Sequence, residues 1–307
     1  MGRTTMNPLG ALGLYTETPL HCGAESGSGY VDLPIQRERH THYPVIPGST
    51  VKGVLRDEMK PAGRLGAKRV QEVFGSDERD NASPGSVSFG DGLLVTFPVR
   101  SSGAPFHWVT CPFVLERAFR TLGGHGPEPK ARAEGKAWGR AARTVLLEEL
   151  RLEVDADEDF FSDAEGSGLS RLLALLPPEE AGFAHTRKVF PERLLVVRDE
   201  DFKVLVETGT EVLTRIKLND LGTTTTVDKK KAEELGIEDR EGNLFVEEVV
   251  PPETLFLCAL RHGEKATDLV EQLQALGVLR LGGDETIGRG LTHLRWVATS
   301  GSTAKEA

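Results

Sequence analysis

The strongest constraint on the fold is the order in which strand-like and helix-like segments follow one another along the 307 residues. Alternation of side-chain type over residues 12–18, ended by Pro19, predicts an opening strand. Five later runs are rich in β-branched and aromatic residues, which favour strands. These predicted strands are 192–199, 202–208, 254–260, 278–281 and 291–298.

Two segments carry helix signals. Ser49 or Thr50 is placed to cap a helix that continues through the good helix formers after it. Asp268 and Glu271 resemble a capping box, and Gly277 stands where a C-terminal cap belongs. The order strand, helix, several strands, helix, strand predicts an α+β fold with an antiparallel sheet covered by helices. A ferredoxin-like core with large insertions fits this order best.

One segment is predicted to project from the core. Residues 219–241 contain almost no large apolar side chains, and strand-like runs flank them at 214–218 and 243–249. Such a pattern predicts a long exposed hairpin, or arm. Three lysines, Lys229 to Lys231, would place positive charge near its tip.

The charge distribution limits how this chain meets nucleic acid. A formal net charge of −10 argues against a protein whose whole surface coats RNA or DNA. Residues 36–69, however, hold eight Lys or Arg against three acids and form the local basic candidate. Residues 148–165 hold nine acids against Arg151, and a solvated insertion is the favoured interpretation.

Composition also bears on compartment and metal binding. The first twenty residues lack the apolar core of a signal peptide and no run is long enough to span a membrane, so we expect a cytoplasmic protein without membrane partners. Cys22, Cys111 and Cys258 are widely spaced and are expected to be reduced thiols. A preformed transition-metal cage is not expected from the scattered histidines.

The stretch from Tyr30 to Arg56 combines a carboxylate, a cationic cluster and a helix start. A helix N-terminus offers free backbone N–H groups to an anion, and Lys52 and Arg56 share one helix face at spacing i, i+4. Gly53 would let a sugar-phosphate strand approach closely. This pattern is typical of phosphate binding, although an ordinary capped surface helix remains an equal alternative.

A second phosphate-binding candidate lies near the C-terminal end. Residues 281–293, LGGDETIGRGLTH, can expose backbone N–H groups and Arg289 to a phosphate. Taken alone, a glycine-rich turn between two strands is the simpler interpretation of this loop.

Three of these runs together resemble a known family. LYTETPLHCG (14–23), VDLPIQRERHTHYPVIPGSTVKGVLR (31–56) and GGDETIGRG (282–290) are similar to the backbone-subunit family, the fourth subunit, of Cmr-type (type III-B) CRISPR complexes within the RAMP superfamily. NLFVEEVVPPETLF (243–256) extends the resemblance less closely.

The resemblance implies one RAMP domain over residues 1–307, with insertions near 110–185 and 214–249. It implies a modified ferredoxin-like (RRM-like) palm with a β-hairpin thumb, which matches the predicted arm. It also implies a helical filament of several copies along a guide RNA, together with other Cmr subunits and a complementary target RNA. The residues expected to contact RNA are Arg37, Arg39, His40, Ser49, Thr50, Lys52, Arg56, Gly282, Gly283, Gly288, Arg289 and Gly290.

The same resemblance implies an endoribonuclease that cuts target RNA at regular intervals, with Asp32 as the catalytic carboxylate and the ligand of a weakly bound Mg²⁺ or Mn²⁺. His21, Glu247 and Glu248 fall where the family places auxiliary catalytic groups. From the residues alone, Asp32 would form an Asx-type turn, His21 would pack in a loop, and the two glutamates would be exposed. Val249 stands where a Tyr is common in the family, so no tyrosine role is expected there.

Three other functions compete with this hypothesis. The first is a backbone that lines RNA without cutting it. The second is a precursor-processing endoribonuclease of the same superfamily, which would lack the 31–40 segment and act without metal. The third is an unrelated acidic α+β domain that binds a protein and purifies free of RNA.

Overall fold

The fold is taken from a computed structural model that describes residues 7–24, 30–61, 63–76, 83–124, 133–236, 238, 241–262 and 266–299. Its strands are β1 (Asn7–Thr16), β2 (Val45–Ile46), β3 (Val87–Arg100), β4 (Phe106–Thr110), β5 (Lys136–Gly139), β6 (Arg143–Leu147), β7 (Leu150–Ala156), β8 (Leu194–Val196), β9 (Glu211–Lys217), β10 (Asn243–Val249), β11 (Leu255–His262), β12 (Val278–Arg280) and β13 (Leu291–Val297). Its α-helices are α1 (Gly48–Met59), α2 (Gly66–Phe74), α3 (Pro112–Thr121), α4 (Gly168–Leu173), α5 (Ala184–Arg193), α6 (Asp199–Thr208), α7 (Lys229–Leu235) and α8 (Thr267–Leu276). Two short 3₁₀ turns, η1 (Glu179–Ala181) and η2 (Glu285–Ile287), complete the elements.

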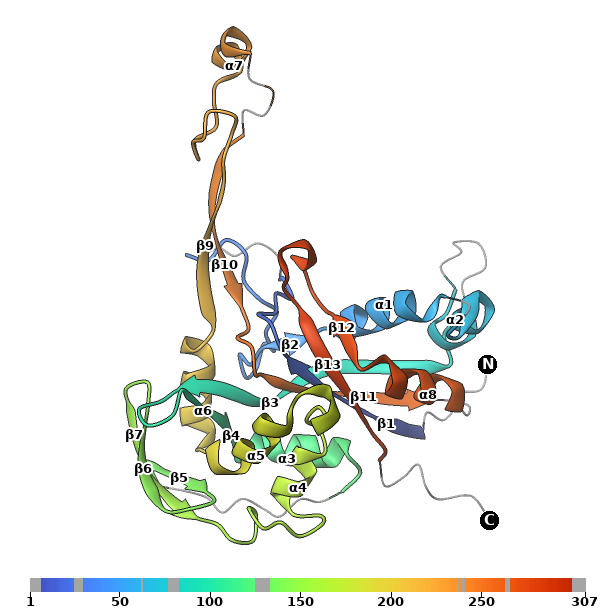
Figure 1. The fold of residues 1–307 in the computed structure, drawn as a ribbon, viewed down its shortest axis with the longest axis vertical. Coiled ribbons are helices and arrows are strands. Elements are labelled where there is room, and N and C mark those ends of the chain that lie inside the picture. Colours follow the sequence, from blue (N-terminus) through green and yellow to red (C-terminus); the bar gives the residue numbers. More distant parts are fainter. Residues whose placement is uncertain are drawn as a thin grey trace.

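One eleven-stranded sheet runs through the body in the order β12-β13-β1-β11-β3-β4-β8-β5-β7-β6, with β2 paired to β3 (Figure 1). Its centre, β13-β1-β11-β3, is antiparallel throughout. The chain reaches β3 from β1 through α1, and β13 from β11 through α8. Each of these two connections therefore skips one strand of the sheet.

Helices cover both faces of this sheet because successive side chains of a strand point to opposite sides. Leu12 and Leu14 of β1 pack in one core with α1, α2 and α8. Ala11 and Tyr15 of the same strand pack in a second core with α3, α4 and α5. The mixed α+β class is therefore confirmed, although the sheet is not purely antiparallel, since β4 pairs with β8 and β5 with β7 in parallel.

The predicted strand at 202–208 is wrong. These residues belong to α6, in which Phe202, Leu205 and Val206 are buried while Lys203 and Val204 face solvent. Burial at spacings of three and four is the helical period, which short apolar runs do not distinguish from a strand pattern. Three acids in the first turn also favour a helix start.

Several predicted boundaries also need correction. The opening strand ends at Thr16, before Pro19, and the run at 192–199 contributes only the three residues of β8. Gly277 ends α8 as predicted, with a positive φ of 68°, but neither predicted N-terminal cap forms. In α1 the Gly48 N–H donates to Asp91 at 2.7 Å, and Asp268 of α8 instead pairs with Arg69 at 2.6 Å. At α1 the carboxylate of another element thus takes the place of a capping side chain, whereas at α8 the Asp268 carboxylate pairs with Arg69 of α2.

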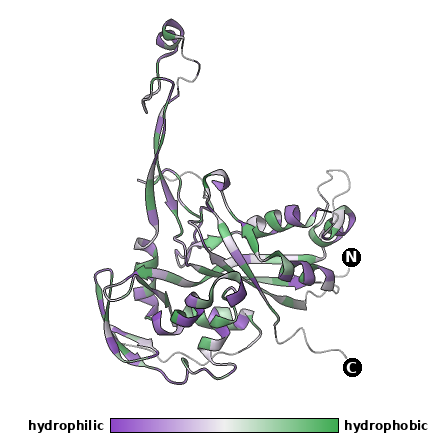
Figure 2. Ribbon diagram, in the orientation of Figure 1, coloured by the Kyte–Doolittle hydropathy of each residue, from purple (hydrophilic) through white to green (hydrophobic). Residues whose placement is uncertain are grey.

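The predicted arm is a two-stranded antiparallel hairpin, β9 and β10, with α7 at its far end (Figure 1). It stands away from the body, and several of its apolar side chains are exposed, among them Val212, Ile216 and Leu244. Figure 2 shows hydrophobic and hydrophilic residues mixed along it. Within the described residues, no helix combines the length and apolar character needed to cross a membrane.

The segment 110–185 contains α3, the small β5-β7-β6 part of the sheet, and α4. Its acids lie around β7 and the following turn, where Phe160 and Phe161 are buried against the second core. Some of these acids form surface ion pairs, such as Glu153 with Lys136.

Candidate functional site

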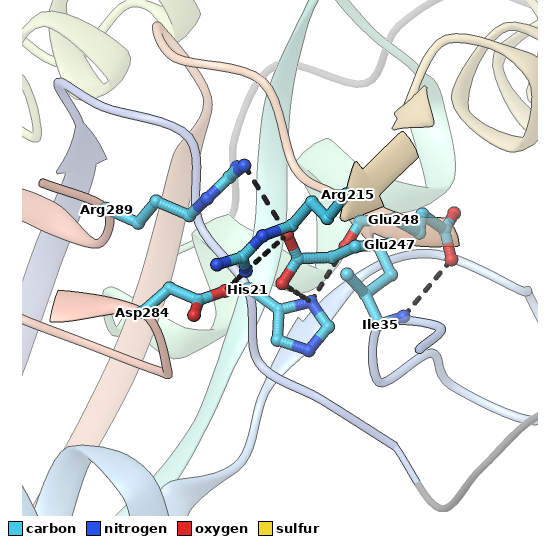
Figure 3. Close-up of polar contacts among 7 residues, drawn as sticks. All are labelled: His21, Ile35, Arg215, Glu247, Glu248, Asp284 and Arg289. Carbon is cyan, nitrogen blue, oxygen red and sulfur yellow. Dashed lines mark hydrogen bonds and ion pairs between the residues drawn. The ribbon is translucent and has the colours of Figure 1, made fainter. Parts of the chain in front are cut away.

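Four segments that are distant in the sequence meet at the foot of the arm (Figure 3). They are the loop after β1, the segment before β2, the end of β10 and the glycine-rich loop between β12 and β13. Backbone hydrogen bonds join them: Leu20 N–H donates to the Val250 carbonyl at 2.9 Å, and Gly283 N–H donates to the His21 carbonyl at 2.8 Å. The fold therefore gathers the three motifs into one place.

Glu248 fastens the arm to the segment before β2. Its carboxylate accepts hydrogen bonds from Arg37 at 2.5 Å, from the Thr210 hydroxyl at 2.7 Å and from the Ile35 backbone N–H at 3.1 Å. Burial acts to raise the pKa of Glu248, but the bonds from Arg37 and Thr210 outweigh it and hold this pKa below its ordinary value. Glu248 is therefore an ionised buried anchor.

Glu247, on the opposite face of β10, fastens the arm to the glycine-rich loop. Its Oε2 lies 3.2 Å from Arg215 of β9 and 3.4 Å from Arg289 of the loop. Arg215 also donates to Asp284 at 2.6 Å. Burial and the neighbouring Asp284 raise the pKa of Glu247, while hydrogen bonding with Glu247 and Arg215 lowers the pKa of Asp284.

Both glutamates are buried, with side-chain exposures of 1% for Glu247 and 11% for Glu248. The expectation of exposed surface acids was therefore wrong. The physical reason is pairing: a buried carboxylate is tolerated when cations and N–H groups satisfy it. Val249, which follows them, is fully buried and brings no polar group.

His21 links the loop after β1 to the same cluster. Its Nδ1 donates to the Glu248 carbonyl at 2.8 Å and lies 3.8 Å from the Glu247 carboxylate. Its carbonyl meets the glycine-rich loop at Gly282, where an added Cβ would lie 2.2 Å from it. Gly282 also has a positive φ of 79°, so both sterics and backbone conformation require glycine there.

Asp32 lies beside β10 but outside the buried cluster. Its side chain is exposed, and its Oδ2 accepts a hydrogen bond from the Val246 N–H at 2.8 Å. In return, the backbone N–H groups of Asp32 and Leu33 donate to the Val246 carbonyl at 3.0 Å. Nowhere in the described ranges do three or more His, Cys, Asp or Glu gather as a metal-binding group.

The predicted RNA-contacting residues divide into two groups. Arg37, Arg56 and Arg289 are held by the protein: by Glu248, by the Gly75 carbonyl at 3.0 Å, and by Glu247. The exposed or partly exposed group comprises Arg39, His40, Ser49, Thr50, Lys52, Gly282, Gly283 and Gly288, whereas Gly290 is buried. The positions on α1 belong to a helix that borders the glycine-rich loop, since Asp57, Glu58 and Glu285 line one pocket.

Three residues of this site were missed from the sequence: Arg215, Asp284 and Thr210. Asp284 is a non-glycine residue with a positive φ of 63° inside a glycine-rich loop. Arg215 is one of two cations, with Lys217, in the strand-like run 214–218, and a cation in a strand is a signal for a specific partner. Neither signal identifies that partner, because Arg215 and Asp284 are 69 residues apart.

Comparison with known proteins places the chain. The RAMP superfamily model matches residues 14–293. A CRISPR system Cmr endoribonuclease, Cmr4 of Pyrococcus furiosus, is 32% identical over 95% of this chain and 97% of its own length. The crystal structure of oligomeric Cmr4 from the same organism is 26% identical, with a TM-score of 0.65, and covers 96% of this chain and 100% of that one.

A chain of a type III-B Cmr-beta assembly bound to cognate target RNA shares the fold, with a TM-score of 0.65 and 21% identity over 94% of this chain and 96% of its own. The family indicated by the three sequence motifs is thus confirmed. This chain belongs to the RAMP superfamily and, within it, to the Cmr4 family of CRISPR Cmr subunits.

Proposed function

We propose that this chain is the backbone subunit of a type III-B CRISPR effector complex, in which several copies assemble along a guide RNA with other Cmr subunits. Each copy would cut the complementary target RNA beside Asp32. The near full-length similarity to a Cmr endoribonuclease supports this function. The oligomeric state of the related Cmr4 crystal structure supports assembly of copies.

In this proposal the centre of the sheet is a ferredoxin-like palm. The order β13-β1-β11-β3 is the order expected of that fold, and so is a helix in each of the two connections, α1 between β1 and β3 and α8 between β11 and β13. The β9–β10 hairpin would be the thumb that interrupts the guide–target duplex. Its exposed aliphatic side chains, among them Ile216 and Leu244, suit insertion between neighbouring bases.

The observation that carries the catalytic assignment is the exposure of Asp32 at the foot of the arm. His21, Glu247 and Glu248 are largely buried and engaged with protein partners. Of the four predicted catalytic groups, Asp32 is therefore the carboxylate that RNA can reach without rearrangement. We assign the other three to holding the segments around it.

The reaction needs little from the protein beyond positioning. In RNA the 2′-oxygen attacks the adjacent phosphorus, the 5′-oxygen leaves, and alignment of these atoms supplies much of the acceleration. Asp32 would accept the 2′-OH proton, and water would supply the proton taken by the departing 5′-oxygen. Its bond from Val246 N–H fixes one carboxylate oxygen, which leaves Oδ1 for this proton.

A divalent ion is compatible with this site only as a weakly held group. Asp32 alone would hold it, since Mg²⁺ often keeps several waters and takes one carboxylate together with substrate phosphates. When bound, Mg²⁺ or Mn²⁺ would offset the negative charge that develops on the phosphate oxygens.

The guide would lie along α1 and the glycine-rich loop. Ser49, Thr50 and Lys52 occupy the first turns of α1, where their side chains are exposed or partly exposed and can donate to phosphate oxygens. Arg39 and His40 are exposed nearby in sequence. Arg37, Arg56 and Arg289 would shape this surface while retaining their protein partners.

The test compares wild type with Asp32→Asn in the complex assembled with guide RNA and partner subunits. Asn keeps an oxygen that can accept from Val246 N–H but removes the negative charge. We expect evenly spaced products from end-labelled target RNA with wild type, and loss of at least about 100-fold in rate for the variant. The variant should bind guide RNA and target RNA as tightly as wild type does, both with and without Mg²⁺.

Asp159→Asn is the matched control, because it removes an exposed aspartate from the lobe that contains β7. It should cut at the wild-type rate. Tight target binding without any products in wild type would make the chain a guide-holding scaffold. Loss of guide binding in Asp32→Asn would refute the separation of binding from cutting.

A further inference from the structure

Arg215 connects three elements at one point. Its Nη1 donates to Asp284 at 2.6 Å and lies 3.2 Å from Glu247, and its guanidinium stacks on Phe245 with 5.4 Å between the carbon and the ring centre. Figure 3 shows Arg215, Glu247 and Asp284 together. Arg215 comes from β9, Glu247 and Phe245 come from β10, and Asp284 comes from the glycine-rich loop. The Arg215 guanidinium therefore joins the arm to the loop, beside the ion pair that Arg289 of the loop makes with Glu247.

The environment makes this connection specific. The Glu247 side chain is 1% exposed, and the side chains of Arg215 and Asp284 are only 27% and 26% exposed. A carboxylate this deeply buried is stable only while its cations stay in place. The backbone of Asp284 is left-handed, with a φ of 63°. Residues other than Gly, Asn and Asp adopt this conformation only at a cost in free energy.

A short chain of contacts runs from this point to Asp32. Glu247 directly follows Val246 in β10, and Leu33 is bridged to Glu247 as a neighbouring strand residue. The backbone of Val246 accepts from Asp32 N–H at 3.0 Å and donates to the Asp32 carboxylate at 2.8 Å. The position of the Asp32 carboxylate is thus set by the part of β10 that Arg215 holds.

We infer that Arg215 and Asp284 are positioning residues that keep Asp32 in register with the glycine-rich loop. The inference rests on the proposed function, in which that loop holds the guide and Asp32 cuts the target. Through this pair, the element that grips the guide and the carboxylate that cuts the opposing strand form one rigid unit. Neither residue needs to touch RNA for this role.

The coupling is tested first without any RNA. Hydrogen exchange of the isolated subunit is compared for wild type, Asp284→Asn, Arg215→Gln and the double variant. Although Asp284 lies on the loop, its substitution should speed exchange of the Val246 and Glu248 amides in β10 on the order of 10-fold. The double variant should be no faster than the faster single variant.

Arg100→Gln is the matched control, because Arg100 forms an ion pair with Glu148 at 2.7 Å that is exposed and lies away from the arm foot. It should leave exchange at Val246 unchanged. Faster exchange confined to the glycine-rich loop, or effects of the two single variants that multiply in the double variant, would overturn the coupling.

The assembled complex tests the consequence. Guide affinity should change less than about 3-fold in both single variants, while the cutting rate at saturating target should fall on the order of 10- to 100-fold. Arg215→Lys keeps the positive charge but loses the planar guanidinium that reaches both carboxylates. It should therefore cut faster than Arg215→Gln and more slowly than wild type. Equal losses of guide affinity and rate would instead indicate a general folding defect and overturn the positioning role.

The two hypotheses fail in different ways. If the wild-type complex does not cut, the proposed function fails, and the exchange experiment still decides whether the arm and the loop are coupled. If the wild type cuts and both variants cut at its rate, the positioning role fails and the proposed function stands.

Discussion

Neighbouring glutamates of β10 perform different tasks because successive side chains of a strand point to opposite faces. Glu247 faces Arg215 and Arg289, whereas Glu248 faces Arg37. Together with Asp284, three carboxylates pair with three guanidiniums at the arm foot. Removing one member of such a cluster leaves an uncompensated charge, so the cluster favours one arrangement of the surrounding segments.

Glu248→Gln tests this anchor through pH. Because the pKa of Glu248 is lower in the folded chain than the unfolded value of about 4.3, ionised Glu248 stabilises the fold at pH values above that range. At pH 7 we expect the variant to lose about 2 kcal/mol of unfolding free energy. The difference from wild type should shrink as pH falls below about 4 and disappear once Glu248 is protonated in the folded state.

Denaturant unfolding from pH 7 to pH 3 measures this difference. Glu207→Gln is the control, since Glu207 pairs with Lys203 at 3.9 Å on the exposed face of α6 and should contribute less than about 1 kcal/mol at any pH. A wild-type advantage that grows toward low pH would contradict the assigned direction of the pKa shift.

At the scale of elements, the sequence predicts best where a local pattern decides the structure. The strands around 254–260 and 291–298 and the arm were found because their apolar patterns and flanks are local. The segment 202–208 was not, since its burial follows α6 packing against neighbours that the pattern does not name. The same limit applies to the site: the motifs indicate Asp32 as a candidate, whereas the pairing of Arg215 with Asp284 depends on the fold.

Gly53 of α1 offers a test of an element against its proposed partner. A Cβ added there would meet no atom within 4 Å, and the position lies inside the helix. Gly53→Ala should therefore stabilise the isolated subunit by about 0.5–1 kcal/mol, because alanine loses less backbone entropy. If a sugar-phosphate strand passes at this point, guide affinity should fall at the same time.

Thermal unfolding and guide-binding titration measure the two effects separately. A more stable subunit with unchanged guide affinity would show that the guide does not approach α1 at Gly53. A less stable subunit would show that the residue is constrained by something other than RNA.

At the scale of the whole molecule, a net charge of −10 has to be reconciled with RNA binding. Their separation in the fold reconciles them: the acids at 148–165 lie in the β5–β7 lobe, whereas the basic segment 36–69, which contains α1 and the start of α2, lies at another part of the sheet (Figure 1). Charges separated by more than about 10 Å are screened at ordinary ionic strength, so a local basic surface acts independently of the total.

Lys52→Glu distinguishes such a local contact from an effect of total charge. Lys52 is partly exposed on α1 and forms no ion pair within the described part of the chain. If it meets a guide phosphate, the variant should bind guide more weakly, and the slope of log affinity against log salt should decrease in magnitude by about 0.7, the value for one single-strand phosphate contact.

Lys203→Glu on α6 makes the same change in net charge on an element remote from α1, and its slope should stay at the wild-type value. Titration of labelled guide RNA at several salt concentrations measures both slopes. Equal changes in the two variants would assign the effect to total charge, and an unchanged slope in Lys52→Glu would exclude α1 as a phosphate clamp.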